Sequence, residues 1–168
     1  MMTRIVSSGL PVLFALCLLL SAPPASAAEP HDRRALEGVE VGKGIFDVNR
    51  GDPRSILLIL GVIEETVDGL LDHGVEPDLI VAFRGPAPRF LLSDLDKVPL
   101  EHVGAAEDLA RYIQQLAARG VRFEACAITL RLMGLEQERL IPEVTVVANT
   151  FNSLIGYQAR GYALIPIL

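Results

Sequence analysis

Strand-like and helix-like segments alternate along most of this chain. After the first strand-like run, Asp52 and Pro53 are typical of a helix N-cap and first helical position, and apolar residues then recur at helical spacing. The expected strands are 41–48, 78–83, 121–125, 144–148 and 162–166, and the expected helices are 56–71, 105–119, 126–133 and 151–160. Such alternation predicts an α/β fold with a mostly parallel sheet of about five strands and helices on both faces.

The N-terminal segment predicts export. Residues 1–27 contain Arg4, an apolar run over 10–20 and the small-residue sequence Ala25-Ser26-Ala27, which together are typical of a cleaved signal peptide. The apolar run is shorter than the roughly 20 residues that a membrane anchor needs. We therefore expect cleavage near Ala27, a flexible N-terminal arm over 28–38, one α/β domain over 39–168, and a periplasmic or secreted location.

Composition and motifs narrow the classes of function. The net charge is −6, and the absence of a run of Lys and Arg argues against nucleic acid as a partner. No second apolar stretch is long enough to span a membrane. We therefore expect the mature protein, after removal of the signal peptide, to be soluble. The three histidines are scattered, and no nucleotide-binding glycine motif or serine-hydrolase elbow is present. We expect no metal site and no cofactor.

The carboxyl ends of the expected strands bring candidate site residues together. In open α/β sheets, ligands bind at this edge. The residues that reach it are Asn49 to Asp52, Arg84 with Gly85, Cys126 with Thr129, and Asn149, Thr150 and Asn152. Asn49, Arg84, Thr129 and Asn149 are the candidate binding residues beside Cys126. If the signal peptide is removed, Cys17 is lost with it and Cys126 is the only cysteine left, so no internal disulfide is expected.

Two interpretations of Cys126 remain open from the residues alone. A thiol near a helix N-terminus has a lowered pKa and is reactive, and Arg84 would lower the pKa further. Glu124 would raise it if the carboxylate faced the sulfur. Alternatively, Cys126 is a small apolar residue that is simply packed, because unpaired cysteines are among the most buried residue types.

Several segments give the chain a resemblance to the DsrE/DsrF-like family. They are Ile45 to Pro53 (IFDVNRGDP), Leu79 to Pro86 (LIVAFRGP), Ala118 to Leu130 (ARGVRFEACAITL), and the ending with V144-T-V-V-A148 and Y157-Q-A-R-G-Y-A163. The resemblance implies a flavodoxin-like three-layer sandwich that assembles as a homo-oligomer, a trimer or hexamer. It also implies sulfur transfer through a persulfide on Cys126.

Three functions follow as hypotheses. The first is a sulfur carrier or sulfurtransferase, in which Cys126 exchanges sulfane sulfur with a thiol-bearing donor or acceptor protein. Arg84 and the helix amides would then stabilise the anion, while Asn49 and Asn149 position the donor. The second is a non-catalytic oligomeric module that binds a small anion. The third is a redox-sensing thiol protein.

Overall fold

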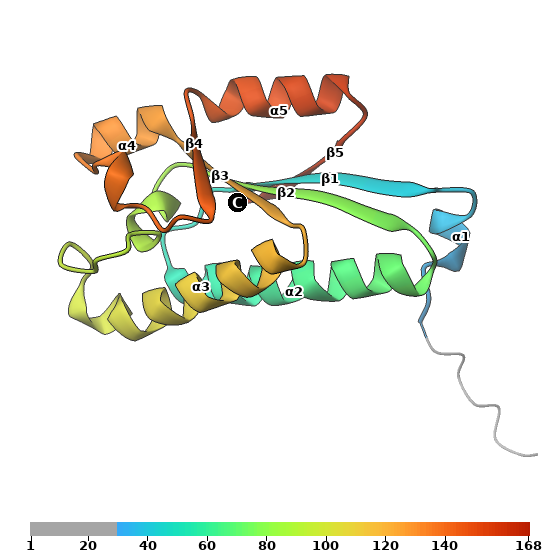
Figure 1. Cartoon of the computed structure of the whole chain (residues 1–168), viewed down its shortest axis with the longest axis horizontal. Coiled ribbons are helices and arrows are strands. Elements are labelled where there is room, and N and C mark those ends of the chain that lie inside the picture. Colours follow the sequence, from blue (N-terminus) through green and yellow to red (C-terminus); the bar gives the residue numbers. More distant parts are fainter. Residues whose placement is uncertain (1–29) are drawn as a thin grey trace, which may run out of the picture. The chain divides into compact units, whose positions relative to one another are not determined.

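The protein contains a five-stranded sheet in which every pair of neighbouring strands is parallel (Figure 1). The computed structural model describes residues 30–168, so the expected signal peptide over 1–27 lies outside the described residues. The strands are β1 (Val41–Val48), β2 (Glu76–Phe83), β3 (Arg122–Cys126), β4 (Val144–Val147) and β5 (Ala163–Ile167). Their order is β4-β3-β2-β1-β5. The predicted α/β fold with about five strands is confirmed, and the sheet is parallel throughout.

Helices cover both faces of this sheet. They are α1 (Arg33–Leu36), α2 (Pro53–Asp72), α3 (Leu100–Ala118), α4 (Ala127–Met133) and α5 (Thr150–Ala159), with 3₁₀ turns η1 (Ala87–Phe90) and η2 (Gln137–Arg139). Helices α2 and α3 lie on one face, and α4 and α5 on the other (Figure 1). The result is the three-layer arrangement that the resemblance implied.

Helix α2 shows how local sequence determines an element. The side chain of Asp52 accepts hydrogen bonds from the backbone N–H groups of Arg54 and Ser55, each at 3.2 Å, and Pro53 occupies the first helical position. Both features stabilise a helix start. The residues that the helix buries against the sheet recur three or four positions apart: Ile56, Leu60, Ile63, Val67 and Leu70. Helix α2 therefore supplies a continuous apolar stripe to the core.

The two faces of the sheet are covered unequally. The side under α2 and α3 holds most of the core, including Phe46, Val81 and Phe123. The side under α5 has a smaller cluster: Ile45, Ile80, Ala82, Leu154 and Tyr162. Because side chains alternate along a strand, Glu124 and Cys126 of β3 point to this second side, whereas Phe123 and Ala125 point to the first.

Most elements have bounds within three residues of the expected ones, but two differ more. Within the segment 28–38, Arg33–Leu36 forms the helical turn α1, and Leu36 packs against the core. Helix α3 begins at Leu100, five positions before the expected start at 105, because Pro99 precedes it and Val103 already contacts the core. Among residues 30–168, no helix is both long and apolar enough to cross a bilayer.

Candidate functional site

Cys126 lies where β3 ends and α4 begins. It is the last residue of the strand and the N-cap of the helix, with φ −78° and ψ 116°. Its register partner is Val147 near the end of β4, so the thiol lies at the carboxyl edge of the sheet. Only 6% of the residue is exposed, and it forms no disulfide. The predicted position is thus correct, but the side chain is largely covered rather than on the surface.

A cavity of about 340 Å³ gives the thiol an opening. It is lined by Arg84, Gly85, Cys126, Ile128, Thr129, Asn149, Thr150 and Phe151. Three of the residues predicted from the sequence, Arg84, Thr129 and Asn149, therefore surround Cys126. These residues follow β2, β3 and β4 in turn, so the parallel topology is what brings them together.

The surroundings of Cys126 favour its thiolate. Burial raises the pKa of the thiol, but hydrogen bonds from the backbone and side chains of Thr150 and Thr129 lower it, to about 7 from an ordinary value of 9.0. Both threonines lie in the first turn of a helix, α5 and α4 respectively, where backbone N–H groups have no partner inside the helix. The Thr150 side chain is fully buried, and within residues 30–168 its hydroxyl forms no hydrogen bond of regular geometry. It is therefore available to donate to the sulfur.

Arg84 contributes a positive charge that is already paired. Its guanidinium donates two hydrogen bonds to the carboxylate of Asp47, at 2.6 and 2.8 Å, and lies 5.5 Å from the centre of the Phe151 ring. The hydrogen bond to Asp47 raises the pKa of Arg84, burial opposes it, and the negative charge of ionised Cys126 adds to the rise. Asp47 therefore holds Arg84 beside the cavity while offsetting most of its charge.

The two asparagines predicted for the site have different positions. Asn149 lines the cavity and also caps α5, where its side-chain oxygen accepts a hydrogen bond of 3.0 Å from the Phe151 backbone. Asn49 lies behind Gly85 rather than on the cavity wall. Gly85 has φ +57°, and a Cβ atom there would come within 1.8 Å of the Asn49 side-chain oxygen. Asn49 therefore lies next to Gly85, a residue of the cavity wall, without lining the cavity itself.

Glu124 lies on the same side of β3 as Cys126, but its carboxylate has another partner. One oxygen accepts a hydrogen bond of 2.9 Å from the Tyr157 hydroxyl, and the other has none among residues 30–168. Burial and this bond raise the pKa of Tyr157. Arg122 does not neutralise Glu124, since it pairs with Asp78 at the amino end of β2. The shift in the pKa of Cys126 comes from burial, Thr150 and Thr129, and not from Glu124.

Sequence reasoning missed Asp47, and it placed Thr150 at this edge without assigning it a role. Asp47 carried a signal: it is the one charged residue in the buried part of β1, and a buried carboxylate there needs a cation. Its pairing with Arg84 depends on strand register, in which Asp47 lies opposite Ala82, two residues before Arg84. Thr150 directly follows Asn149, but nothing in its spacing distinguishes it from other helix-starting threonines.

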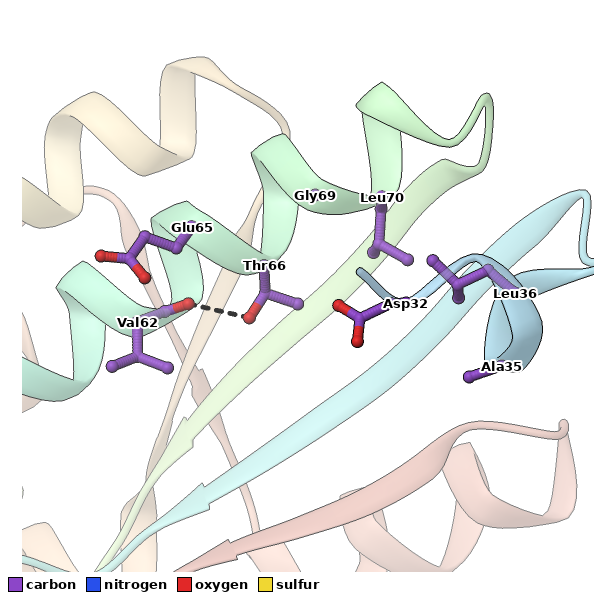
Figure 2. Close-up of a pocket in the computed structure, with 8 residues that line it drawn as sticks. All are labelled: Asp32, Ala35, Leu36, Val62, Glu65, Thr66, Gly69 and Leu70. Atoms are coloured by element: carbon purple, nitrogen blue, oxygen red, sulfur yellow. Dashed lines mark hydrogen bonds between the residues drawn. The ribbon is translucent and has the colours of Figure 1, made fainter. Parts of the chain in front are cut away.

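A larger cavity of about 410 Å³ lies away from the thiol, between α1 and α2 (Figure 2). Its walls are mostly apolar, with the carboxylates of Asp32 and Glu65 beside them. The Thr66 hydroxyl already donates to the Val62 carbonyl at 2.8 Å. No His, Cys, Asp and Glu residues of the part described, 30–168, cluster in a way that would hold a metal ion. The side chains that could take part in chemistry therefore lie around Cys126 and not in this larger cavity.

Comparison with known proteins agrees with this architecture. The model of the DsrE/DsrF-like family matches residues 43–167, which include every strand except the first two residues of β1. This chain belongs to that family. Membership suggests a role in sulfur relay.

The individual relatives support the fold, but their names state no activity. An uncharacterized protein of Aquifex aeolicus (strain VF5) is 26% identical over 125 residues, which are 74% of this chain and 55% of that protein. The chain thus spans about half the length of the curated relative it matches. A solved protein of unknown function from Methanobacterium thermoautotrophicum is similar with a TM-score of 0.59 and 22% identity, covering 74% of this chain and 98% of that one. This second likeness supports the α/β fold.

Proposed function

We propose that this protein is a sulfur carrier that accepts sulfane sulfur as a persulfide on Cys126 and passes it to an acceptor thiol. The observation that carries the proposal is a thiol with a pKa of about 7 that opens into a cavity of its own. The thiolate is the nucleophilic form of cysteine, and a pKa near 7 makes it abundant at neutral pH without losing nucleophilicity.

The chemistry balances in two steps. With thiosulfate, the thiolate attacks the outer sulfur, an S–S bond to Cys126 forms, the S–S bond of thiosulfate breaks, and sulfite leaves. In the second step an acceptor thiolate attacks the terminal persulfide sulfur, and Cys126 leaves as a thiolate. The hydrogen bonds from Thr150 and Thr129 would stabilise the anionic sulfur before and after each step.

Charge pairing favours a carrier over a dedicated anion-binding module. Arg84 is the only cationic residue lining the cavity, and Asp47 offsets its charge. A guanidinium that is already paired attracts a bound anion less strongly than a free one does. Here the polar groups converge on the sulfur, which supports a role in which the sulfur itself becomes the anion.

Intact-mass analysis tests the proposal. The mature protein is incubated with thiosulfate or polysulfide, and Cys126→Ser serves as the control. We expect a mass increase of one sulfur atom on the natural protein, reversed by an added thiol, and none on the variant. If the natural protein gains no sulfur from any donor, or if the variant gains it equally, the proposal is wrong. Alkylation gives a second test: a Cys126 that is merely packed would react with an alkylating reagent only after the protein is unfolded.

We further propose that the carrier acts after export and as a homo-oligomer. Residues 1–27 have the pattern of a cleaved signal peptide, which supports export. Exposed apolar side chains on the α5 side, such as Ile155, support assembly. N-terminal sequencing of protein recovered from a secreting host tests export, with a start near Ala28 as the expected result. The donor or acceptor would then be a thiol-bearing protein or small molecule of the same compartment.

A further inference from the structure

A second cavity adjoins the one that contains the thiol. It has a volume of about 310 Å³ and is lined by Gly85, Pro86, Arg89, Thr129, Leu132 and Met133. Gly85 and Thr129 line both cavities, so the two share a wall. Thr129 is also one of the residues whose hydrogen bonds lower the pKa of Cys126. A molecule whose reactive end lies at Cys126 therefore has room for its other end in the second cavity.

The walls of this second cavity are chemically distinct from those around the thiol. Leu132, Met133 and Pro86 make most of it apolar, and Leu132 is 79% exposed. Arg89, in η1, is the cationic residue of the lining, and no carboxylate lines the cavity with it. Within residues 30–168, Arg89 forms no ion pair, whereas Arg84 is held by Asp47. The combination of an apolar wall and an uncompensated guanidinium suits a short carbon chain that carries a carboxylate.

We propose that the second cavity binds the organic part of a small persulfide donor, R–S–SH, in which R is a short carbon chain bearing a carboxylate. The carboxylate would pair with Arg89 and the chain would lie along Leu132 and Met133. This inference rests on the proposed function, since it names the donor that the carrier takes. Inorganic thiosulfate has no group that would occupy the second cavity.

The transfer step balances without another reactant. The Cys126 thiolate attacks the terminal sulfur of R–S–SH, so that an S–S bond to Cys126 forms and the S–S bond of the donor breaks. The products are Cys126–S–SH and R–S⁻. The leaving sulfur keeps the electron pair of the broken bond and departs as the thiolate, while the proton of the donor stays on the transferred sulfur. Cys126 is oxidised to the persulfide level, and the donor sulfur is reduced to a thiolate.

A matched pair of donors tests the inference. One is the persulfide of N-acetylcysteine, which has a carboxylate, and the other is the persulfide of N-acetylcysteine amide, which differs only in lacking that charge. The rate at which Cys126 gains one sulfur atom is followed by intact mass at donor concentrations below saturation. We expect the natural protein to prefer the acid about tenfold, because a charge-assisted pair with Arg89 is made only with the acid.

Variants separate the groups involved. Arg89→Gln should reduce the preference for the acid to about onefold, while Arg34→Gln, on α1 at the other end of α2, should keep it near tenfold. Leu132→Ser should slow both donors to a similar extent. Equal rates for acid and amide in the natural protein, or an unchanged preference in Arg89→Gln, would overturn the inference while leaving the carrier function standing. No sulfur gained from these donors, thiosulfate or polysulfide would overturn both.

Discussion

At the scale of single residues, the site depends on a conflict between burial and hydrogen bonding. Burial alone would keep the Cys126 thiol protonated, because a thiolate is poorly solvated there. Hydrogen bonds from Thr150 and Thr129 reverse the balance. The two readings that the sequence left open, a packed cysteine and a reactive one, therefore describe the same side chain. Cys126 is buried, yet the residues around its cavity supply the hydrogen-bond donors that a thiolate needs.

The first prediction concerns the ionisation of Cys126. We expect its rate of alkylation by iodoacetamide to rise with a midpoint near pH 7. Thr150→Val keeps the volume but removes a buried hydroxyl donor, so the midpoint should rise by about one pH unit. Thr145→Val, on the exposed part of β4, is the control and should leave the midpoint unchanged. An equal midpoint in Thr150→Val and the natural protein would contradict the role of that hydroxyl.

The same ionisation gives stability a pH dependence of known sign. The folded pKa, about 7, lies below the ordinary value of 9.0, so folding favours the thiolate. The contribution is therefore fully present above about pH 9 and is lost as the pH falls through 7. We expect the difference in unfolding free energy between the natural protein and Cys126→Ala to shrink between pH 9 and pH 6 in urea titrations. A constant difference across that range would contradict a lowered pKa.

A third prediction concerns the pair of Asp47 and Arg84. Asp47→Asn keeps the shape of the side chain but leaves the guanidinium without its counter-charge. Because Asp47 is buried while Arg84 is partly exposed, we expect a loss of about 1–3 kcal/mol in unfolding free energy. Asp108→Asn breaks an exposed pair with Arg111 and should cost less than about 1 kcal/mol. Similar losses in urea denaturation would show that burial does not strengthen the first pair.

At the scale of elements, the sequence patterns predicted more of the fold than of the site. Strand β1 has the expected bounds, 41–48, because its apolar residues and the capped helix after it leave little freedom. Helix α1 was missed because four residues show no periodicity, and the contact of Leu36 with the core, which helps to hold it, is a tertiary one. The edge of the sheet could be predicted, so Arg84, Thr129 and Asn149 were found.

What could not be predicted depends on register and backbone angles. Asp47 meets Arg84 only because β1 and β2 pair in one particular register, which no pattern in either strand specifies. Asn49 was expected to position a donor, yet it lies next to Gly85 and does not line the cavity. Which way a side chain points at a strand end is set by the next few backbone angles. Composition and spacing carry little information about these angles.

Gly85 provides a prediction at this scale. Gly85→Ala should destabilise the protein by about 1–3 kcal/mol, because a Cβ is strained at φ +57° and would collide with Asn49. Gly104→Ala is the matched control: it lies within α3 with open space around it, so alanine should stabilise the helix by up to about 1 kcal/mol. Urea denaturation of both variants measures the two effects. Equal and small changes would show that the Gly85 turn tolerates a side chain.

At the scale of the whole domain, the thinly covered side of the sheet leaves apolar side chains exposed beside the edge strand β5, although α2 also exposes Leu58 and Leu71. Helices α2 and α3 have 20 and 19 residues, whereas α4 and α5 have only 7 and 10. On this thinner side Ile155 is 66% exposed, and Leu164 of the edge strand β5 is half-exposed beside Ile45. Exposing these apolar side chains to water is unfavourable for a monomer. A second copy that covers it would remove that cost, as the proposed homo-oligomer requires.

Light scattering coupled to gel filtration tests this assembly. We expect the mature protein to elute as a trimer or hexamer, and Ile155→Lys and Leu164→Lys to shift it toward the monomer, because a buried lysine at an interface is unpaired. Leu71→Lys changes a similarly exposed leucine near the end of α2 and should leave the assembly intact. Circular dichroism of each variant confirms that the fold persists. If the natural protein elutes as a monomer, or if only Leu71→Lys dissociates it, the α5 side is not where the copies meet.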